Sequence, residues 1–311
     1  NSVHAARRHD SSMSPTRPVV LISAAVFEEP RWVDTLLLNV RHFTEPSTRV
    51  MLHLNALTQY ADVDVQRWNG SAAHVGVATQ RVAVSWSTGS LLYAHMLSIA
   101  EAARRWPICE YVVLQASNML WVRAGMELRV RSLRSSVTSA RPLAPPMLYA
   151  RTHPFYKSLL GSRKRDSWNY HEGSFYPIST PLRFLPFMED WFQHRSTSNG
   201  TCLPALFPSK EMKTTCSAAN VTGDRAMAVR FIMRAIRFPE EMWLSAFALN
   251  VEGLPPAKQR PSQLCFRDAT LGSVMSASRQ LKLQNPHNLL VSTPYTTRAQ
   301  AQTASTSSCP T

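Results

Sequence analysis

Two adjacent carboxylates, Glu240 and Glu241, lie in the stretch RFPEEMWLSAF (237–247), directly before a run of bulky apolar residues. A carboxylate at the edge of a core can act as a general base, because burial and charged neighbours tune its pKa. Helix-start electrostatics explain the same pair without catalysis. Pro239 fits the first helical position, and the helix dipole stabilises each first-turn acid by about 0.3–1 kcal/mol. The stretch alone supports both interpretations.

A further carboxylate suited to a ligand is Glu172, in the segment HEGSFYPIS (171–179). It stands beside Gly173, Ser174 and Phe175. Aromatic faces near a carboxylate are typical of sugar sites, where a ring face stacks on the sugar and the sugar hydroxyls donate hydrogen bonds. The alternative is a turn glycine inside an ordinary strand.

Asp62 and Asp64 form a D-x-D pair, a motif whose carboxylate oxygens can bind Mn²⁺ or Mg²⁺ against a diphosphate. The pair alternates with valines in YADVDVQRW (60–68), which indicates polar residues on the solvated edge of a strand. The dispersed histidines and cysteines lack zinc-site spacing. We therefore expect no metal and no other cofactor.

Nucleotide-binding and hydrolase signatures are missing from the sequence. It contains no G-x-G-x-x-G, no P-loop and no G-x-S-x-G. These absences disfavour dinucleotide oxidoreductases, P-loop kinases or ATPases, and α/β-hydrolases.

Apolar runs that predict strands alternate with segments of helical periodicity in the first half of the chain. Strands are predicted at 19–25, 48–56, 81–86 and 110–117, and helices at 29–43 and 89–106. A further helix, rich in Trp and Phe, is predicted around FLPFMEDWF (184–192). The alternation indicates an α/β fold with a doubly wound, mostly parallel sheet, which binds ligands at the carboxyl ends of its strands.

Small and polar residues stand where two of these strands end, at 87–90 and 116–118. They suit contacts to a nucleotide, and capping of the strand–helix junctions explains them as well.

Cys202 and Cys216 bracket an irregular polar segment, and the sequons at Asn199 and Asn220 flank it. We expect an insertion at about 196–222, closed by a disulfide between these two cysteines, in a glycoprotein of the secretory pathway. A third sequon begins at Asn69. Cys109 lies in a strand-like run and is expected to be an inert buried thiol.

Polar, aperiodic ends at 1–17 and 293–311 predict mobile tails around one domain at 18–292. The net charge of +14 invites a nucleic-acid interpretation. The basic residues are scattered, however, and no recognition helix, zinc-finger spacing or RNA-binding aromatic signature accompanies them. We expect no nucleic-acid partner.

The motifs above, in this order, resemble the core 2/I-branching β-1,6-N-acetylglucosaminyltransferase family and its plant and bacterial relatives over about residues 18–292. The first shared motif has a Trp followed four residues later by Ser and then by apolar residues and Ala: Trp86, Ser90, Leu91, Leu92 and Ala94. The second is a strand end near the donor nucleotide, where Ser117 is shared, Asn118 replaces the family's Asp and Leu120 its Pro.

Two further motifs complete the resemblance. A Gly-Ser-aromatic strand that ends in Ser is matched by Gly173, Ser174, Phe175 and Ser179, in the region expected to bind the acceptor together with Glu172. A Pro-acid-Glu helix start, which holds the family's general base, maps onto Pro239, Glu240 and Glu241.

The resemblance implies a GT-A-type glycosyltransferase fold, with an acceptor-binding region attached to the nucleotide-binding sheet. It implies metal-independent, inverting transfer of a sugar from a UDP-sugar to a hydroxyl of a glycan or glycoprotein, with Glu241 as the base. Without a metal, cations near the C-terminus must stabilise the leaving diphosphate. The stretch ASRQLKLQNPHNLL (277–290) resembles the closing segment of some relatives, which selects Arg279 and Lys282. The expected location is the Golgi lumen, with a type II membrane anchor upstream of this chain.

The replacement of Asp by Asn118 leaves a second hypothesis open, a catalytically inactive carbohydrate-binding or interaction module of the same fold. A third is a basic nucleic-acid-binding protein.

Overall fold

The structure is a computed structural model that describes residues 19–70, 74–85, 88–121, 124–137, 153–161, 173–196, 233, 242–256 and 290–292. Both expected tails lie outside these residues, and so does nearly all of the expected insertion.

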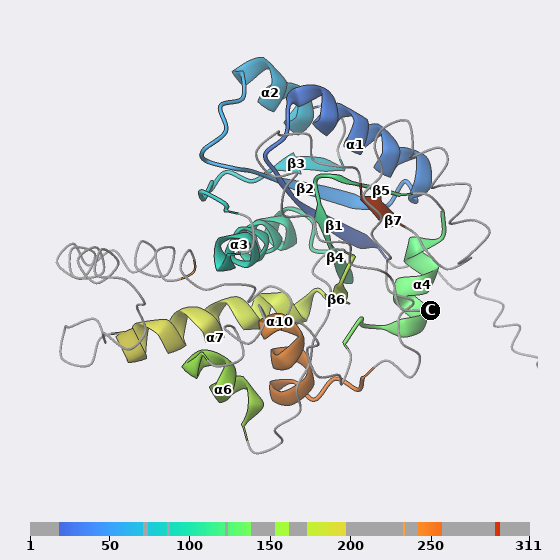
Figure 1. The fold of residues 1–311 in the computed structure, drawn as a ribbon. Coiled ribbons are helices and arrows are strands. Elements are labelled where there is room, and N and C mark those ends of the chain that lie inside the picture. Colours follow the sequence, from blue (N-terminus) through green and yellow to red (C-terminus); the bar gives the residue numbers. More distant parts are fainter. Residues whose placement is uncertain are drawn as a thin grey trace, which may run out of the picture.

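A five-stranded sheet forms the centre of the fold, in the order β3-β2-β1-β4-β6 (Figure 1). Its strands are β1 (Val20–Val26), β2 (Arg49–Leu54), β3 (Val75–Val77), β4 (Tyr111–Ala116) and β6 (Phe175–Pro177). The first four strands run parallel, and β6 is antiparallel to β4. The predicted α/β fold with a mostly parallel sheet is therefore confirmed.

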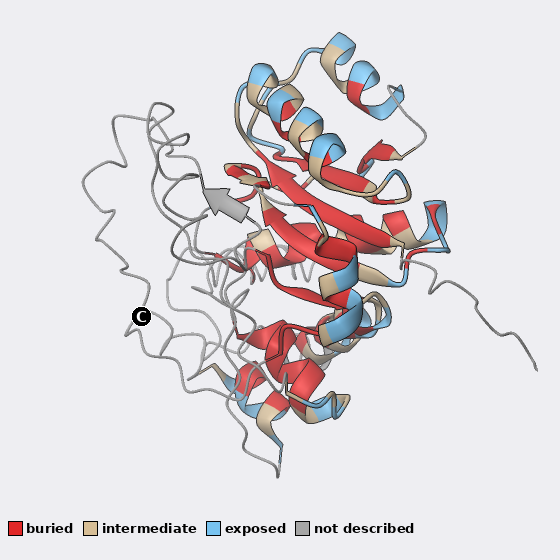
Figure 2. Cartoon of the chain, turned by 90° about the vertical axis from the view of Figure 1, so that its right-hand side faces the viewer, coloured by how far each residue is buried: buried red, intermediate tan, exposed pale blue. Residues whose placement is uncertain are grey.

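Helices cover both faces of the sheet, because successive residues of a strand point to opposite sides. The helices α1 (Pro30–Phe43) and α2 (Asp62–Gly70) lie on one face, and α3 (Gly89–Arg105) and α7 (Ser179–Ser196) on the other (Figure 1). Within β1, Val20 and Ile22 belong to the core under α1, whereas Leu21 belongs to the core under α3. Figure 2 shows the strands between these layers as almost wholly buried.

The third strand lies earlier in the chain than the sequence predicts. Residues 75–77 pair with Val50–Leu52 as β3, and 81–85 form no strand. Side chains at the end of β2 hold this later segment instead: the Val82 N–H donates to His53 Nε2 (3.1 Å) and the Val84 N–H to Asn55 Oδ1 (3.0 Å). The expected strand at 81–86 was therefore wrong. Its backbone groups bond to these side chains and to the Ala56 N–H, which donates to the Val82 oxygen (3.1 Å), rather than to a strand ladder.

The second half of the described chain builds an aromatic layer below α3. It contributes α6 (Pro154–Leu160), α10 (Trp243–Ala246) and the π-helix η4 (Phe247–Val251) to this layer, whereas α4 (Met126–Leu133) packs with the core under α1. The Phe155 ring of α6 lies 5.4 Å from Phe192 of α7 and 4.6 Å from Trp243 of α10, between ring centroids. These contacts join the three helices and confirm the predicted Trp- and Phe-rich helix, which lies within α7.

A second, two-stranded sheet pairs β5 (Met119–Trp121) with β7 (Leu290–Ser292) in antiparallel register. It brings residues near the C-terminus beside the segment that follows β4.

None of the helices that the structure describes has the length and hydropathy needed to cross a membrane.

Candidate functional site

The sheet changes its winding direction between β1 and β4. From β1 the chain passes through α1 to β2 on one side, whereas β4 is reached through α3 on the opposite face and pairs with the other edge of β1. In open α/β sheets, ligands bind outside the carboxyl ends of the strands at such a point. The residues that follow β1 and β4 are therefore the first to consider.

Glu28 follows β1 at this position. The Phe27 N–H donates to its Oε2 (3.1 Å), and the Tyr60 hydroxyl donates to its backbone oxygen (2.9 Å). The other carboxylate oxygen, Oε1, is buried and has no hydrogen-bond partner among the described residues. Burial of a polar atom without a partner costs about 1–3 kcal/mol, so this oxygen calls for an explanation.

Ser117 follows β4, in the turn that leads to β5. Its side chain is 7% exposed, and its Oγ is also buried without a hydrogen-bond partner among the described residues. Burial raises the pKa of the Glu28 carboxyl, and hydrogen bonding with the Ser117 hydroxyl and with the backbone N–H groups of Phe27 and Glu28 opposes this to a smaller extent. The two oxygens, from the ends of two neighbouring strands, thus lie close to each other, and neither makes a hydrogen bond of ordinary geometry among the described residues.

Sequence reasoning missed Glu28 as a site residue, because Glu28 and Glu29 stand directly before a helix and resemble ordinary helix-start acids. The structure separates the pair. Glu29 is exposed and forms a surface ion pair with Arg31 (2.9 Å), whereas Glu28 turns inward. An acid directly after a fully apolar strand was the available signal.

The structure brings the predicted Gly-Ser-aromatic segment beside β4. The Gly173 N–H donates to the Leu114 oxygen (2.7 Å), and the Leu114 N–H donates to the Ser174 oxygen (2.8 Å). Gly173 has a φ of 76°, a conformation that favours glycine. Gly173 and Ser174 therefore lie beside β4, the strand that ends at Ala116 directly before Ser117 and Asn118.

The side chains of this segment pack inward. Ser174 is 3% exposed and Phe175 6%, and the Phe175 ring belongs to the core on the α1 face of the sheet. The Phe175 N–H also donates to Ser136 Oγ (2.9 Å). In this structure Phe175 therefore fixes β6, and its ring face is not open to solvent.

Ser90, predicted to contact the donor nucleotide, closes the turn at the start of α3. Its Oγ accepts a hydrogen bond from the Ser85 N–H (2.9 Å) and lies 2.6 Å from Thr88 Oγ1, which donates to the Ser85 oxygen (2.9 Å). These bonds hold the two ends of the short segment that contains Trp86. The observed contacts of Ser90 are thus with its own turn.

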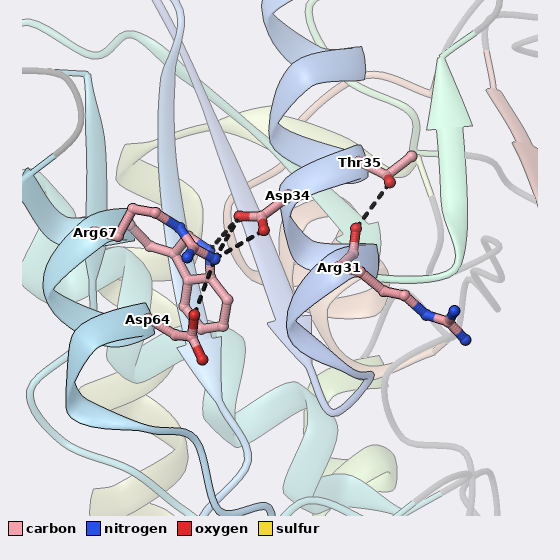
Figure 3. A network of polar contacts seen from close by, with 6 residues as sticks. Arg31, Asp34, Thr35, Asp64 and Arg67 are labelled. Atoms are coloured by element: carbon pink, nitrogen blue, oxygen red, sulfur yellow. Dashed lines mark hydrogen bonds and ion pairs between the residues drawn. The ribbon is translucent and has the colours of Figure 1, made fainter.

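The D-x-D pair lies in the first turn of α2 and not on a strand edge, so the expected alternating strand was wrong there. Asp64 forms an ion pair with Arg67 (3.0 Å), which also binds Asp34 of α1 (2.8 Å; Figure 3). Residues two apart on a helix point in different directions, so Asp62 and Asp64 do not share one cation-facing side. Among the described residues, no group of three His, Cys, Asp or Glu side chains is placed to hold a metal ion.

Asn69 is exposed near the end of α2, as a glycosylation acceptor must be. Its Oδ1 accepts hydrogen bonds from the Val77 N–H (3.2 Å) and from Arg105 Nη1 (2.9 Å), so it also ties β3 to α3. Cys109 is 5% exposed, and burial raises the pKa of its thiol to about 11, as expected for an inert buried thiol.

The other predicted site residues lie outside the described part of the chain and remain predictions: Glu241, Trp86, Glu172, Arg279, Lys282, Asn199, Asn220, Cys202 and Cys216. Glu241 directly precedes Met242 and Trp243, which are both fully buried in the layer that joins α6, α7 and α10.

No protein-family model matches this chain, and no curated protein matches it. The residues of the site are therefore the basis on which a function is assigned.

Proposed function

We propose that this protein is an inverting glycosyltransferase of the GT-A type, which transfers a sugar from a UDP-sugar to a hydroxyl of a glycan or glycoprotein. The observation that carries the proposal is the pair of unsatisfied buried oxygens, Glu28 Oε1 and Ser117 Oγ, at the carboxyl ends of β1 and β4. Polar atoms left without partners at a topological switch point suit a ligand that supplies hydrogen bonds.

The chemistry of Glu28 indicates which part of the donor it meets. An acid whose burial already favours the neutral form is a poor neighbour for a diphosphate, whose charge would oppose ionisation further. Hydroxyl and N–H groups of the nucleoside make better partners, because each can donate to Oε1. In our proposal Glu28 and Ser117 therefore bind the uridine portion, with Asn118 at its side.

The reaction requires a base and a means of stabilising the leaving group. Glu241 takes the proton from the acceptor hydroxyl as that oxygen attacks the anomeric carbon of the donor sugar. The bond between that carbon and the diphosphate oxygen breaks, and UDP leaves with growing negative charge. Arg279 and Lys282 stabilise this charge in place of a metal ion. Attack from the face opposite the leaving group inverts the anomeric configuration.

A donor screen tests the proposal. The protein is incubated with UDP-GlcNAc, UDP-xylose, UDP-glucuronic acid and UDP-galactose, and released UDP is measured with and without a mixture of glycan acceptors. We expect turnover with one of these donors that persists in the presence of a chelator and is abolished in Glu241→Gln. Glu240→Gln is the matched control, since it removes the neighbouring charge and should keep activity.

Absence of turnover with every donor, combined with retained binding of UDP or glycan, would favour an inactive binding module instead. Strict dependence on Mn²⁺ would contradict the metal-independent mechanism. The proposed lumenal Golgi location predicts N-glycans at Asn69, Asn199 and Asn220, which site-by-site mass spectrometry of the protein from a eukaryotic host would detect.

A further inference from the structure

A buried amide side chain, that of Gln115, interrupts the apolar run of β4 one residue before the strand ends. Gln115 is fully buried, and its backbone pairs with Ala24 of β1. Val113, two residues earlier, belongs to the core under α1, so the Gln115 side chain points to the same face of the sheet. Removing an amide from water costs free energy unless it is hydrogen-bonded, so a glutamine at this position requires partners.

Both ends of the Gln115 amide have their partners on β5. Its Nε2 donates to the backbone oxygen of Met119 (3.0 Å), and its Oε1 accepts a hydrogen bond from Trp121 Nε1 (3.0 Å). The first bond spans the turn formed by Ser117 and Asn118, because Met119 is the first residue of β5. The second bond sets the orientation of the amide, since an indole N–H can only donate and must meet the amide oxygen.

A second amide, Asn39 of α1, holds the other end of β5. The Trp121 N–H donates to Asn39 Oδ1 (2.7 Å), and Asn39 Nδ2 donates to the Trp121 oxygen (2.9 Å). Backbone groups of residues two apart in a strand point to the same edge, so Asn39 and Gln115 line one edge of β5. Two side chains thus take the place of a neighbouring strand along that edge, and they fix β5 to α1 and to β4.

The turn that the Gln115 bond spans carries half of the candidate site. Ser117 Oγ lies close to the Glu28 carboxyl, and it makes no hydrogen bond of ordinary geometry among the described residues. The place of this hydroxyl relative to Glu28 is therefore set by the backbone of the turn. A two-residue turn can adopt several backbone conformations, and the bond from Gln115 to Met119 favours the observed one by holding its two ends together.

We infer that Gln115 is a positioning residue of the donor site, which holds the turn after β4 so that Ser117 meets the nucleoside together with Glu28. This inference rests on the proposed binding of UDP at these two residues. Gln115 is buried and both ends of its amide are occupied within the protein, so it acts through the turn and not by touching the ligand. Without it, the turn loosens and the Ser117 hydroxyl spends less time in the position that the ligand requires.

Gln115→Met tests this role, because methionine has a similar shape but cannot donate to the Met119 oxygen. In calorimetric titrations of the full chain, its affinity for UDP should fall by about threefold to tenfold, the loss expected for one neutral hydrogen bond to the ligand. Trp121→Phe is a second variant. It removes the indole N–H that orients the amide, and it should weaken UDP binding in the same direction.

Thr48→Val is the matched control for a general loss of stability. It removes a buried hydrogen bond, from Thr48 Oγ1 to Glu127 Oε1 (2.6 Å), and lies next to the amino end of β2, at the edge of the sheet opposite the donor site. Its affinity for UDP should equal that of the wild type. In the free protein, amide exchange at 117–119 should be faster in Gln115→Met than in the wild type or in Thr48→Val.

A double-mutant cycle with Ser117→Ala separates positioning from an unrelated structural effect. Ser117→Ala should itself weaken UDP binding by about twofold to tenfold. Gln115→Met should weaken it much less when Ser117 is already alanine, because the hydroxyl that the turn positions is then absent.

The outcomes distinguish this inference from the proposed function. Wild-type affinity in Gln115→Met, a loss that Thr48→Val shares, unchanged exchange at 117–119, or single effects that simply multiply in the double variant would each overturn the role of Gln115. Failure of the wild type to bind UDP, or unchanged binding in both Ser117→Ala and Glu28→Gln, would contradict the proposed function, and the role of Gln115 in donor binding would fall with it.

Discussion

Replacing Glu28 by Gln should stabilise the protein at neutral pH and at the same time weaken its binding of the donor. The carboxyl Oε1 is buried without a partner, while Oε2 accepts one hydrogen bond from the Phe27 N–H. A glutamine keeps the shape and can accept that same bond through its amide oxygen. Its amide nitrogen can donate to Ser117 Oγ, which also lacks a partner among the described residues.

The magnitude follows from the direction of the pKa change. Burial raises the pKa of Glu28 in the folded protein, and each pKa unit between folded and unfolded states corresponds to about 1.4 kcal/mol. At low pH the carboxyl is neutral in both the folded and the unfolded state, so folding carries no cost of burying its charge. As the pH rises past the ordinary glutamate value, the unfolded chain ionises first, and stability falls until the folded pKa is passed. Because the side chain is only partly enclosed, we expect a gain of about 1 kcal/mol for Glu28→Gln, at the low end for a buried unsatisfied group.

Urea unfolding of the wild type and Glu28→Gln, compared between about pH 4 and pH 8, measures this effect. The advantage of the variant should be small at the acid end and grow as the pH rises. Glu29→Gln is the matched control, because Glu29 is exposed and forms only a surface ion pair, so its change should stay within about 0.5 kcal/mol. An advantage of Glu28→Gln that does not vary with pH, or a loss of stability at neutral pH, would refute the assigned cause.

Three further outcomes test the fold. Gly76→Ala should destabilise the protein by about 1–3 kcal/mol in urea unfolding, because the new Cβ would lie 2.7 Å from Arg105 Nη1 and 2.9 Å from Trp106 Cη2. Gly70→Ala is the control: a Cβ there would have nothing within 4 Å, so this variant should be nearly as stable as the wild type. Iodoacetamide at about pH 8 should leave Cys109 unmodified in the native protein and label it after unfolding, since the thiol pKa is about 11; native labelling on peptide mapping would show that the thiol is accessible. Burial lowers the pKa of His153 to about 4, so as the pH falls the unfolded chain is protonated first, and stability should fall by up to about 3 kcal/mol between about pH 6.5 and pH 4. His153→Asn retains a side chain able to cap α6 and should lose most of this acid sensitivity. An unchanged pH dependence of stability in this variant would assign the acid sensitivity to other groups.

The parts of the fold that the sequence predicts well are those in which one physical signal dominates. Strands β1, β2 and β4 are buried on both faces and read as continuous apolar runs. Helix α1 combines Pro30 at its start with an apolar stripe at Val33, Leu36 and Val40. These elements fix the carboxyl edge of the sheet, so the region of the candidate site is predictable from local pattern.

Errors arise where two signals compete. Residues 81–85 alternate as a strand would, yet their backbone is held by His53 and Asn55, which only tertiary structure reveals. The D-x-D pair also alternates, but its acids lie in the first turn of a helix, a position that the helix dipole favours.

Glu28 was overlooked for a related reason. A helix-start acid and an inward-facing acid look the same in sequence, and only the burial of one carboxylate oxygen separates Glu28 from Glu29.

The central claim is that UDP binds at the carboxyl ends of β1 and β4, and hydrogen–deuterium exchange with and without UDP tests it most directly. Peptides that cover Val26–Glu29 and Gln115–Met119 should gain protection when UDP is added, and Glu28→Gln should reduce that gain at a fixed UDP concentration. Peptides of α2 that contain Asp62 and Asp64 should remain unchanged. Protection confined to other segments, or equal protection in the wild type and Glu28→Gln, would contradict the assignment of the site.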